Sequence, residues 1–177
     1  MSLQQGNLKP GPSTDPDIAA VDVSLGLSPV ILARTIGPPR LDRMNATNEW
    51  IASQLRGARL EGSRLAVVLD VSGRRNRPTP EQQRAMATWL TTNRELLEES
   101  CVAWSMVVTS PILRGVLTAI TWFAPFPCPM KVHASVYIGA GWGVDMLVSQ
   151  RVPVSALLRD AASRRALIES INFETLP

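Results

Sequence analysis

Residues 65–90, LAVVLDVSGRRNRPTPEQQRAMATWL, decide the fold that the sequence predicts. The first five residues are a continuous apolar run bounded by turn residues, which is typical of a central strand buried on both faces. A Thr-Pro-Glu-Gln run begins at Thr79 and has the composition of a helix start: a capping threonine, a proline at the first helical position and a glutamine three residues after the cap. Apolar residues at helical spacing follow. The stretch therefore predicts a buried strand, a polar loop and a helix.

The same alternation of strands and helices continues on both sides of this stretch. Residues 136–147 can continue as a strand or form a helix, because Gly139, Gly141 and Gly143 weaken either assignment. Strands that alternate with helices of 10 to 20 residues predict an α/β fold. The β-type runs lie at residues 21–27, 30–35, 101–108 and 131–134, and helical spacing marks residues 41–55, 110–123 and 155–171.

Length and composition predict one folded domain with tails. The chain has 177 residues, of which 45% are hydrophobic and 19% charged, so it can bury a self-sufficient core. We expect a flexible leader at residues 1–18, an α/β domain at 19–148 and a C-terminal helical extension at 149–177. Because no apolar run is long enough to span a membrane and the N-terminus lacks the pattern of a secretion signal, we expect a cytoplasmic protein.

Together with residues 110–129, SPILRGVLTAITWFAPFPCP, the central stretch resembles the STAS-like domains related to bacterial anti-sigma-factor antagonists. In that family a strand ends in an Asp-x-Ser-Gly-type turn before a loop and a long helix, and the next strand leads into a Pro-x-x-Arg-Gly helix. Pro111, Arg114 and Gly115 match the second motif, and the resemblance covers about residues 21–148. It implies an α/β fold with a mixed sheet of four or five strands flanked by helices, to which this chain adds a C-terminal helix.

The resemblance also implies that the domain binds other proteins and does not catalyse a reaction. Anti-sigma-factor antagonists switch by phosphorylation of a serine in the loop that opens the helix after the central strand, and that position falls at or beside Thr79. The serine pattern of the family is replaced here by Pro-Thr-Pro-Glu. Thr79 is therefore either a helix cap alone, contributing about 1 kcal/mol, or a phosphosite at a helix N-terminus with arginines nearby.

The densest basic cluster of the chain directly precedes Thr79. Arg74, Arg75 and Arg77 lie in the loop that leaves the carboxyl end of the central strand, where open α/β sheets usually place their ligands. Arg84 follows on the helix. These residues predict contact with an acidic partner or an anionic ligand, and a solvated loop is the alternative interpretation.

The segment that matches the second family motif supplies the remaining candidates for partner binding. They are Arg114, Trp122 and Phe126, which are followed or separated by prolines that stiffen the segment. A partner surface, packing in the core and a pocket for a lipid or another apolar ligand are three interpretations that the sequence leaves open.

Other kinds of chemistry have little support in the sequence. His133 is the only histidine, which excludes a metal site with a histidine pair, and Cys101 and Cys128 are expected to be buried thiols. The sequence contains no set of residues typical of an active site, and no cofactor is expected. Binding to nucleic acid would need a wider basic stripe than this sequence has, and the net charge is only +3. We expect a non-enzymatic bacterial regulatory or adaptor domain in signalling. The alternative is a module that senses a small anion or apolar molecule at the same end of the sheet, and a homodimer through the C-terminal helix stays open.

Overall fold

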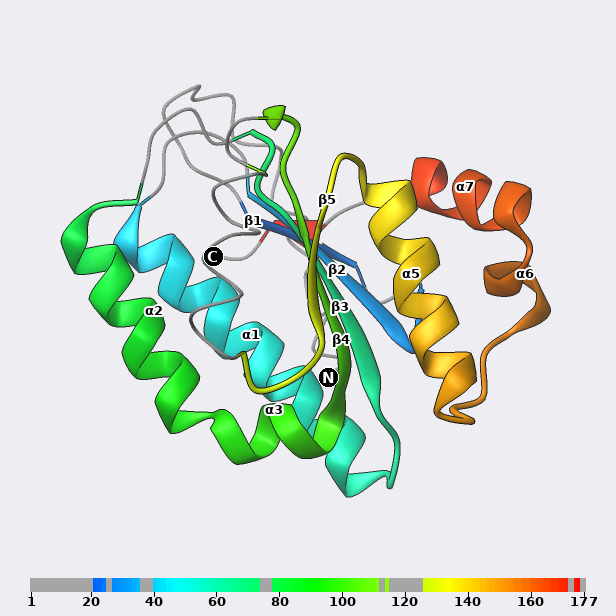
Figure 1. The fold of residues 1–177 in the computed structure, drawn as a ribbon, viewed down its shortest axis with the longest axis horizontal. Helices are drawn as coiled ribbons and strands as arrows, with labels where there is room; N and C mark the ends of the chain where they lie inside the picture. The colour runs from blue at the N-terminus through cyan, green and yellow to red at the C-terminus, as the bar shows by residue number, and fades with distance from the viewer. Residues whose placement is uncertain are drawn as a thin grey trace, which may run out of the picture.

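The computed structural model describes residues 21–24, 27–35, 40–73, 78–111, 114, 126–171 and 174–175. Within these residues a mixed sheet of six strands has the order β5-β4-β3-β2-β1-β6 (Figure 1). Neighbouring strands from β2 to β5 are parallel, whereas β1 is antiparallel to both β2 and β6. The strands are β1 (Val21–Ser24), β2 (Val30–Thr35), β3 (Leu65–Asp70), β4 (Cys101–Val107), β5 (Met130–His133) and β6 (Glu174–Thr175).

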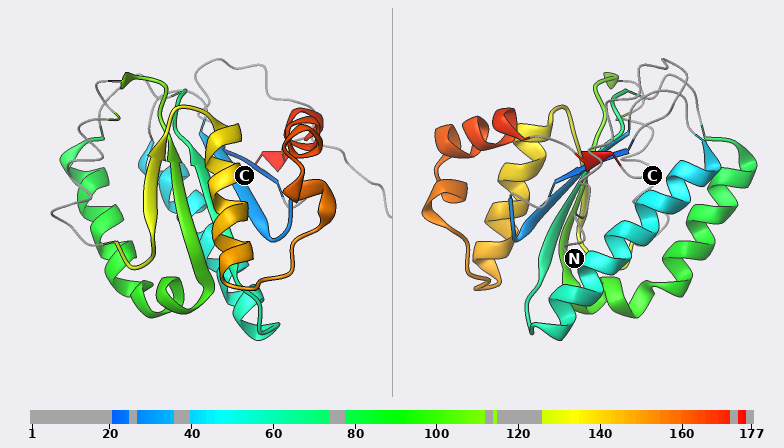
Figure 2. Two further views of the ribbon diagram at one scale, coloured as in Figure 1. Left: turned by 45° about the vertical axis from the view of Figure 1, so that its right-hand side comes forward. Right: turned by 180° about the vertical axis from the view of Figure 1, so that it is seen from behind.

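Helices cover both faces of the sheet, so the predicted α/β class with a mixed, helix-flanked sheet is confirmed. Figure 2 shows the two helical layers from other directions. The described sheet has more strands than the four or five expected, because β6 is only two residues long and leaves no alternating pattern in the sequence. One face carries α1 (Leu41–Leu60), α2 (Pro80–Thr92) and α3 (Arg94–Ser100), and the other carries α5 (Val136–Ser149), α6 (Ala156–Arg159) and α7 (Ala161–Ser170).

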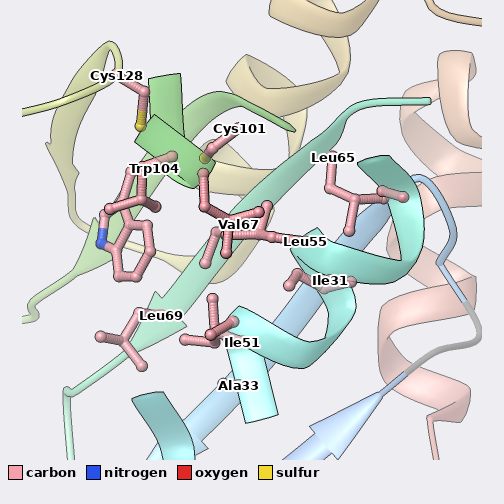
Figure 3. Packing of buried hydrophobic residues seen from close by; sticks show 14 of the residues in the cluster. Ile31, Ala33, Ile51, Leu55, Leu65, Val67, Leu69, Cys101, Trp104 and Cys128 are labelled. Carbon is pink, nitrogen blue, oxygen red and sulfur yellow. The ribbon is translucent and has the colours of Figure 1, made fainter. Parts of the chain in front are cut away.

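The two faces of the sheet have separate hydrophobic cores. Successive residues of β3 point to opposite faces, so Val67 packs under α1 to α3 while Val68 packs under α5 to α7. All six residues of β3 are buried, which confirms the prediction of a central strand covered on both sides. Figure 3 shows the first core, in which Ile51 and Leu55 of α1 lie against Val67 and Trp104 lies beside them.

Residues 136–149 form the helix α5, which settles the ambiguity left by the three glycines. Ser135 caps it, because its hydroxyl accepts a hydrogen bond from the backbone N–H of Ile138 at 3.4 Å. Gly139 and Gly143 face the sheet one helical turn apart, and a β-carbon at Gly143 would lie 3.1 Å from the β-carbon of Ala66 in β3. The glycines therefore let the helix backbone approach the sheet closely.

The prediction of a single helix at residues 155–171 is wrong, because the C-terminal extension contains two helices, α6 and α7. Asp160 adopts an extended backbone (φ −73°, ψ 126°) that ends α6 and begins α7. Its carboxylate accepts a hydrogen bond from the backbone N–H of Ser163 at 2.8 Å, so it is the N-cap of a new helix. Leu158 and Ile168 of these two helices are buried in the second core, and β6 beyond them pairs with β1.

Two predictions fall mainly outside the described residues. The leader at 1–18 lies outside them, and of the helix predicted at 110–123 only Pro111 and Arg114 are described as helical. Among the helices that are described, none is long and apolar enough to cross a membrane.

Candidate functional site

The carboxyl ends of the parallel strands meet at one edge of the sheet and form the candidate site. β2, β3, β4 and β5 end there at Thr35, Asp70, Val107 and His133. Loops that leave this edge are the usual ligand-binding elements of open α/β sheets. The sequence placed the arginine-rich loop at this edge, between Gly73 and Pro78.

Asp70 anchors the beginning of that loop. One carboxylate oxygen (Oδ1) accepts hydrogen bonds from the backbone N–H of Ser72 at 3.0 Å and from its hydroxyl at 2.5 Å. The other (Oδ2) lies 3.3 Å from Nε of Arg34, which pairs with Asp70 across the parallel strands β2 and β3. The hydroxyl of Thr35 donates to the backbone carbonyl of Asp70 at 3.2 Å. Both carboxylate oxygens of Asp70 are therefore occupied by donor groups of the chain itself, from Ser72 and Arg34.

Thr79 anchors the end of the loop. Its hydroxyl accepts a hydrogen bond from the backbone N–H of Gln82 at 3.2 Å, and the side-chain carbonyl of Gln82 accepts one from the backbone N–H of Thr79 at 2.9 Å. This reciprocal pair confirms the predicted capping box. Thr79 is exposed whereas Gln82 is buried. Phosphorylation of Thr79 stays a prediction.

The other predicted site residues occupy different surroundings. Arg84 is exposed in the second turn of α2, close to Thr79 along the helix. Arg114 is half-buried, and its Nη1 donates hydrogen bonds to the backbone carbonyls of Val108 at 3.0 Å and Thr109 at 2.8 Å, just beyond β4. Arg74, Arg75, Arg77 and Trp122 lie outside the described residues.

Phe126 lies in the segment that leads into β5. It is half-buried and packs against the first core, with its ring centroid 5.2 Å from that of Trp104. The structure therefore places Thr79 at the N-cap of α2 and Arg84 within that helix, and it places Phe126 against the core.

Known proteins give no further guide to the site. No protein-family model, curated protein or solved structure matches the chain. The resemblance to STAS-like domains therefore stays a prediction.

His133 and Trp142 form a second feature at the same edge, which sequence reasoning missed. Their ring centroids are 5.4 Å apart, and Nζ of Lys131 lies 5.1 Å from the Trp142 ring centroid. Nε2 of His133 is buried and has no hydrogen-bond partner in the described part of the chain. Burial, and then the charge of Lys131, lower the pKa of His133, so the neutral imidazole is favoured. No sequence pattern indicated this pair, because Trp142 lies in the glycine-rich segment at residues 136–147, which the sequence left open between strand and helix.

Proposed function

We propose that the chain is a STAS-like regulatory or adaptor domain of the bacterial cytoplasm that binds an acidic protein surface and catalyses no reaction. The observation that carries this proposal is the two-sided anchoring of the arginine-rich loop. Asp70 fixes the chain before the loop through Ser72, and Thr79 fixes the chain after it through Gln82. Anchors of this kind lower the entropy that a loop loses when it binds a partner.

The charge of the loop and helix start favours an acidic partner. Residues 73–84 contain four arginines and one glutamate. Arg84 and Glu81 are both exposed at the start of α2, next to the exposed Thr79. A basic surface of this kind increases the rate at which an acidic partner associates and disfavours basic partners.

The surroundings of Asp70 support a binding function over catalysis. Asp70 lies four residues before Arg74, and both of its carboxylate oxygens are engaged by Arg34 and Ser72. A general base needs an oxygen within reach of a substrate proton. Asp70 is built instead as a support for the loop.

The proposal is tested by affinity capture of partners from a lysate of the native organism. Arg75→Glu/Arg77→Glu and Arg84→Glu reverse charge at the proposed surface. Arg94→Glu makes the same change at an exposed position on α3, where the arginine pairs only with Glu98 among the described acidic side chains. We expect a stoichiometric protein partner with the wild type and with Arg94→Glu, and its loss with the other two variants. Equal capture by all four proteins, or no captured partner, would refute the proposal.

A second candidate function is the sensing of a small anion at the same edge, and His133 is the observation that favours it. Its buried Nε2 lacks a partner among the described residues, and the Lys131 ammonium group lies near the same Trp142 ring. Titration with inorganic phosphate and with small carboxylates should then raise the melting temperature of the wild type but not of His133→Gln. An unchanged melting temperature at all concentrations would exclude this candidate.

A further inference from the structure

The two cysteines of the chain lie side by side in the first core. Cys101, the first residue of β4, and Cys128, two residues before β5, are both buried. Both belong to the same cluster of core side chains, and Sγ of Cys101 donates a hydrogen bond to the backbone carbonyl of Ala103 at 3.3 Å. Figure 3 shows both cysteines beside Trp104. Residues 27 positions apart in the sequence thus form a thiol pair.

A bulge in β4 turns Cys101 toward its neighbour. Cys101 pairs with Leu65 of β3, but the next pair along the strand is Ala103 with Ala66, so β4 carries one extra residue at this point. As a result Cys101 faces the same core as Trp104, whereas Ala103 faces the other one.

Backbone pairing places Cys128 opposite this bulge. β5 pairs in parallel with β4 from Trp104 and Met130 onward. One further hydrogen bond, from the backbone N–H of Trp104 to the carbonyl of Pro129 at 2.8 Å, extends the pairing toward Cys128. The contact between the thiols therefore follows from the sheet itself and not from the choice of side-chain rotamers alone.

We propose that Cys101 and Cys128 are a modification site at which a peroxide forms an intramolecular disulfide. One sulfur attacks the O–O bond of hydrogen peroxide and becomes a sulfenic acid, and the other peroxide oxygen leaves as water with the proton of that thiol. The second sulfur then attacks the sulfenic sulfur, the S–S bond forms, and the OH group leaves as water with the second thiol proton. The two thiols lose two electrons, and the peroxide gains them.

The apolar surroundings favour the product and slow the reaction. The neighbouring Cys101 thiol, and then burial, raise the pKa of Cys128, so its thiol stays protonated and reacts slowly. A disulfide carries neither a charge nor an ionisable proton, so the same burial does not oppose it. Oxidation should therefore require prolonged exposure and should yield the disulfide in preference to higher sulfur oxides, because the second thiol is already in contact.

The disulfide would join the segment before β5 covalently to β4. It would close a chain segment that runs from Cys101 to Cys128 and includes Arg114 and Phe126 of the predicted partner segment. Because the joined residues are neighbours in the folded state, the bond restricts mainly the unfolded chain. This site is independent of the function proposed above.

The experiment treats the full chain with hydrogen peroxide, removes the oxidant, alkylates the denatured protein and maps its peptides. We expect both thiols to disappear together and a reductant to restore both. The peptides that contain Cys101 and Cys128 should be joined by a disulfide in protein that remains monomeric. Oxidation of methionines adds oxygen but does not consume thiols, so thiol counting separates the two reactions. We also expect the oxidised protein to melt at a higher temperature than the reduced protein.

Single-cysteine variants provide the control. Cys128→Ala and, independently, Cys101→Ala leave one thiol, which should remain free for alkylation or form an adduct without any intramolecular link. Three results on the wild type would overturn the proposal even if neither variant folds: two free thiols after prolonged oxidation, sulfinic acid without a link, or links between chains only. A melting temperature that does not rise in the linked protein would also contradict the geometry.

Discussion

The close approach of α5 to the sheet predicts opposite outcomes for the same substitution at two glycines. Gly143 and Gly57 are both inside helices and both have ordinary helical backbone. A β-carbon at Gly143 would lie 3.1 Å from the β-carbon of Ala66, whereas a β-carbon at Gly57 would meet no atom within 4 Å. Ala66 is fully buried in β3, which is paired with strands on both sides, so it has no room to move away.

The two substitutions share one favourable effect and differ in one unfavourable effect. Replacing glycine by alanine inside a helix increases stability by about 1 kcal/mol, because alanine loses less backbone entropy on folding. Gly57→Ala should show this gain alone. Gly143→Ala adds the overpacking of a tight interface, which typically costs about 1–3 kcal/mol. We therefore expect Gly143→Ala to be roughly 1 kcal/mol less stable than the wild type, and about 2 kcal/mol less stable than Gly57→Ala.

Urea denaturation, followed by tryptophan fluorescence and circular dichroism, measures both variants against the wild type. The decisive quantity is the difference between the two free energies of unfolding, since helix propensity cancels in it. If Gly143→Ala proves as stabilising as Gly57→Ala, the helix does not lie as close to Ala66 as the structure has it. The same reasoning then fails for Gly139, where a β-carbon would lie 3.2 Å from the β-carbon of Ser105.

Three further perturbations address the candidate site. Thr79→Ala removes one half of the capping box and should lower the free energy of unfolding by about 1 kcal/mol in urea denaturation, whereas Thr79→Ser should retain it. Because the pKa of His133 is lowered from 6.5 in the folded state, the unfolded chain binds a proton that the folded chain does not, so the urea midpoint should fall as the pH drops below 6.5. His133→Gln should remove that part of the pH dependence, and an unchanged slope would contradict the assignment. Asp70→Asn keeps an acceptor for Ser72 but removes the charge facing Arg34, and should cost roughly 1–3 kcal/mol; wild-type stability would show that the pair contributes nothing.

The sequence predicted the elements whose signals are local. The apolar run of β3 and the Thr79–Gln82 capping box each depend on a few consecutive residues, and the structure confirms both. Local signals failed where a single polar residue restarts a helix: Asp160 divides the C-terminal segment, although the apolar spacing across it continues. A capping aspartate inside a helical pattern looks like any exposed helical residue until its backbone conformation is known.

Contacts between distant strands could not be predicted in the same way. α5 is helical although its glycines disfavour a helix, because Gly139 and Gly143 fit against Ser105 and Ala66 of the sheet. Neither neighbour is adjacent in sequence, and the need for small residues becomes visible only when helix and sheet are placed together. Packing against the sheet therefore outweighs the intrinsic preference of the segment.

The two anchors of the arginine-rich loop show where prediction from sequence ends at the site itself. The anchor at Thr79 closes over three residues and was predicted, whereas the anchor at Asp70 depends partly on Arg34, which is 36 residues away and adjacent only through the parallel pairing of β2 and β3. The first can be lost by a local substitution, but the second depends on the register of the sheet. The described chain is therefore held after the loop by a local capping box, and before the loop by a contact that depends on the pairing of two strands in the core.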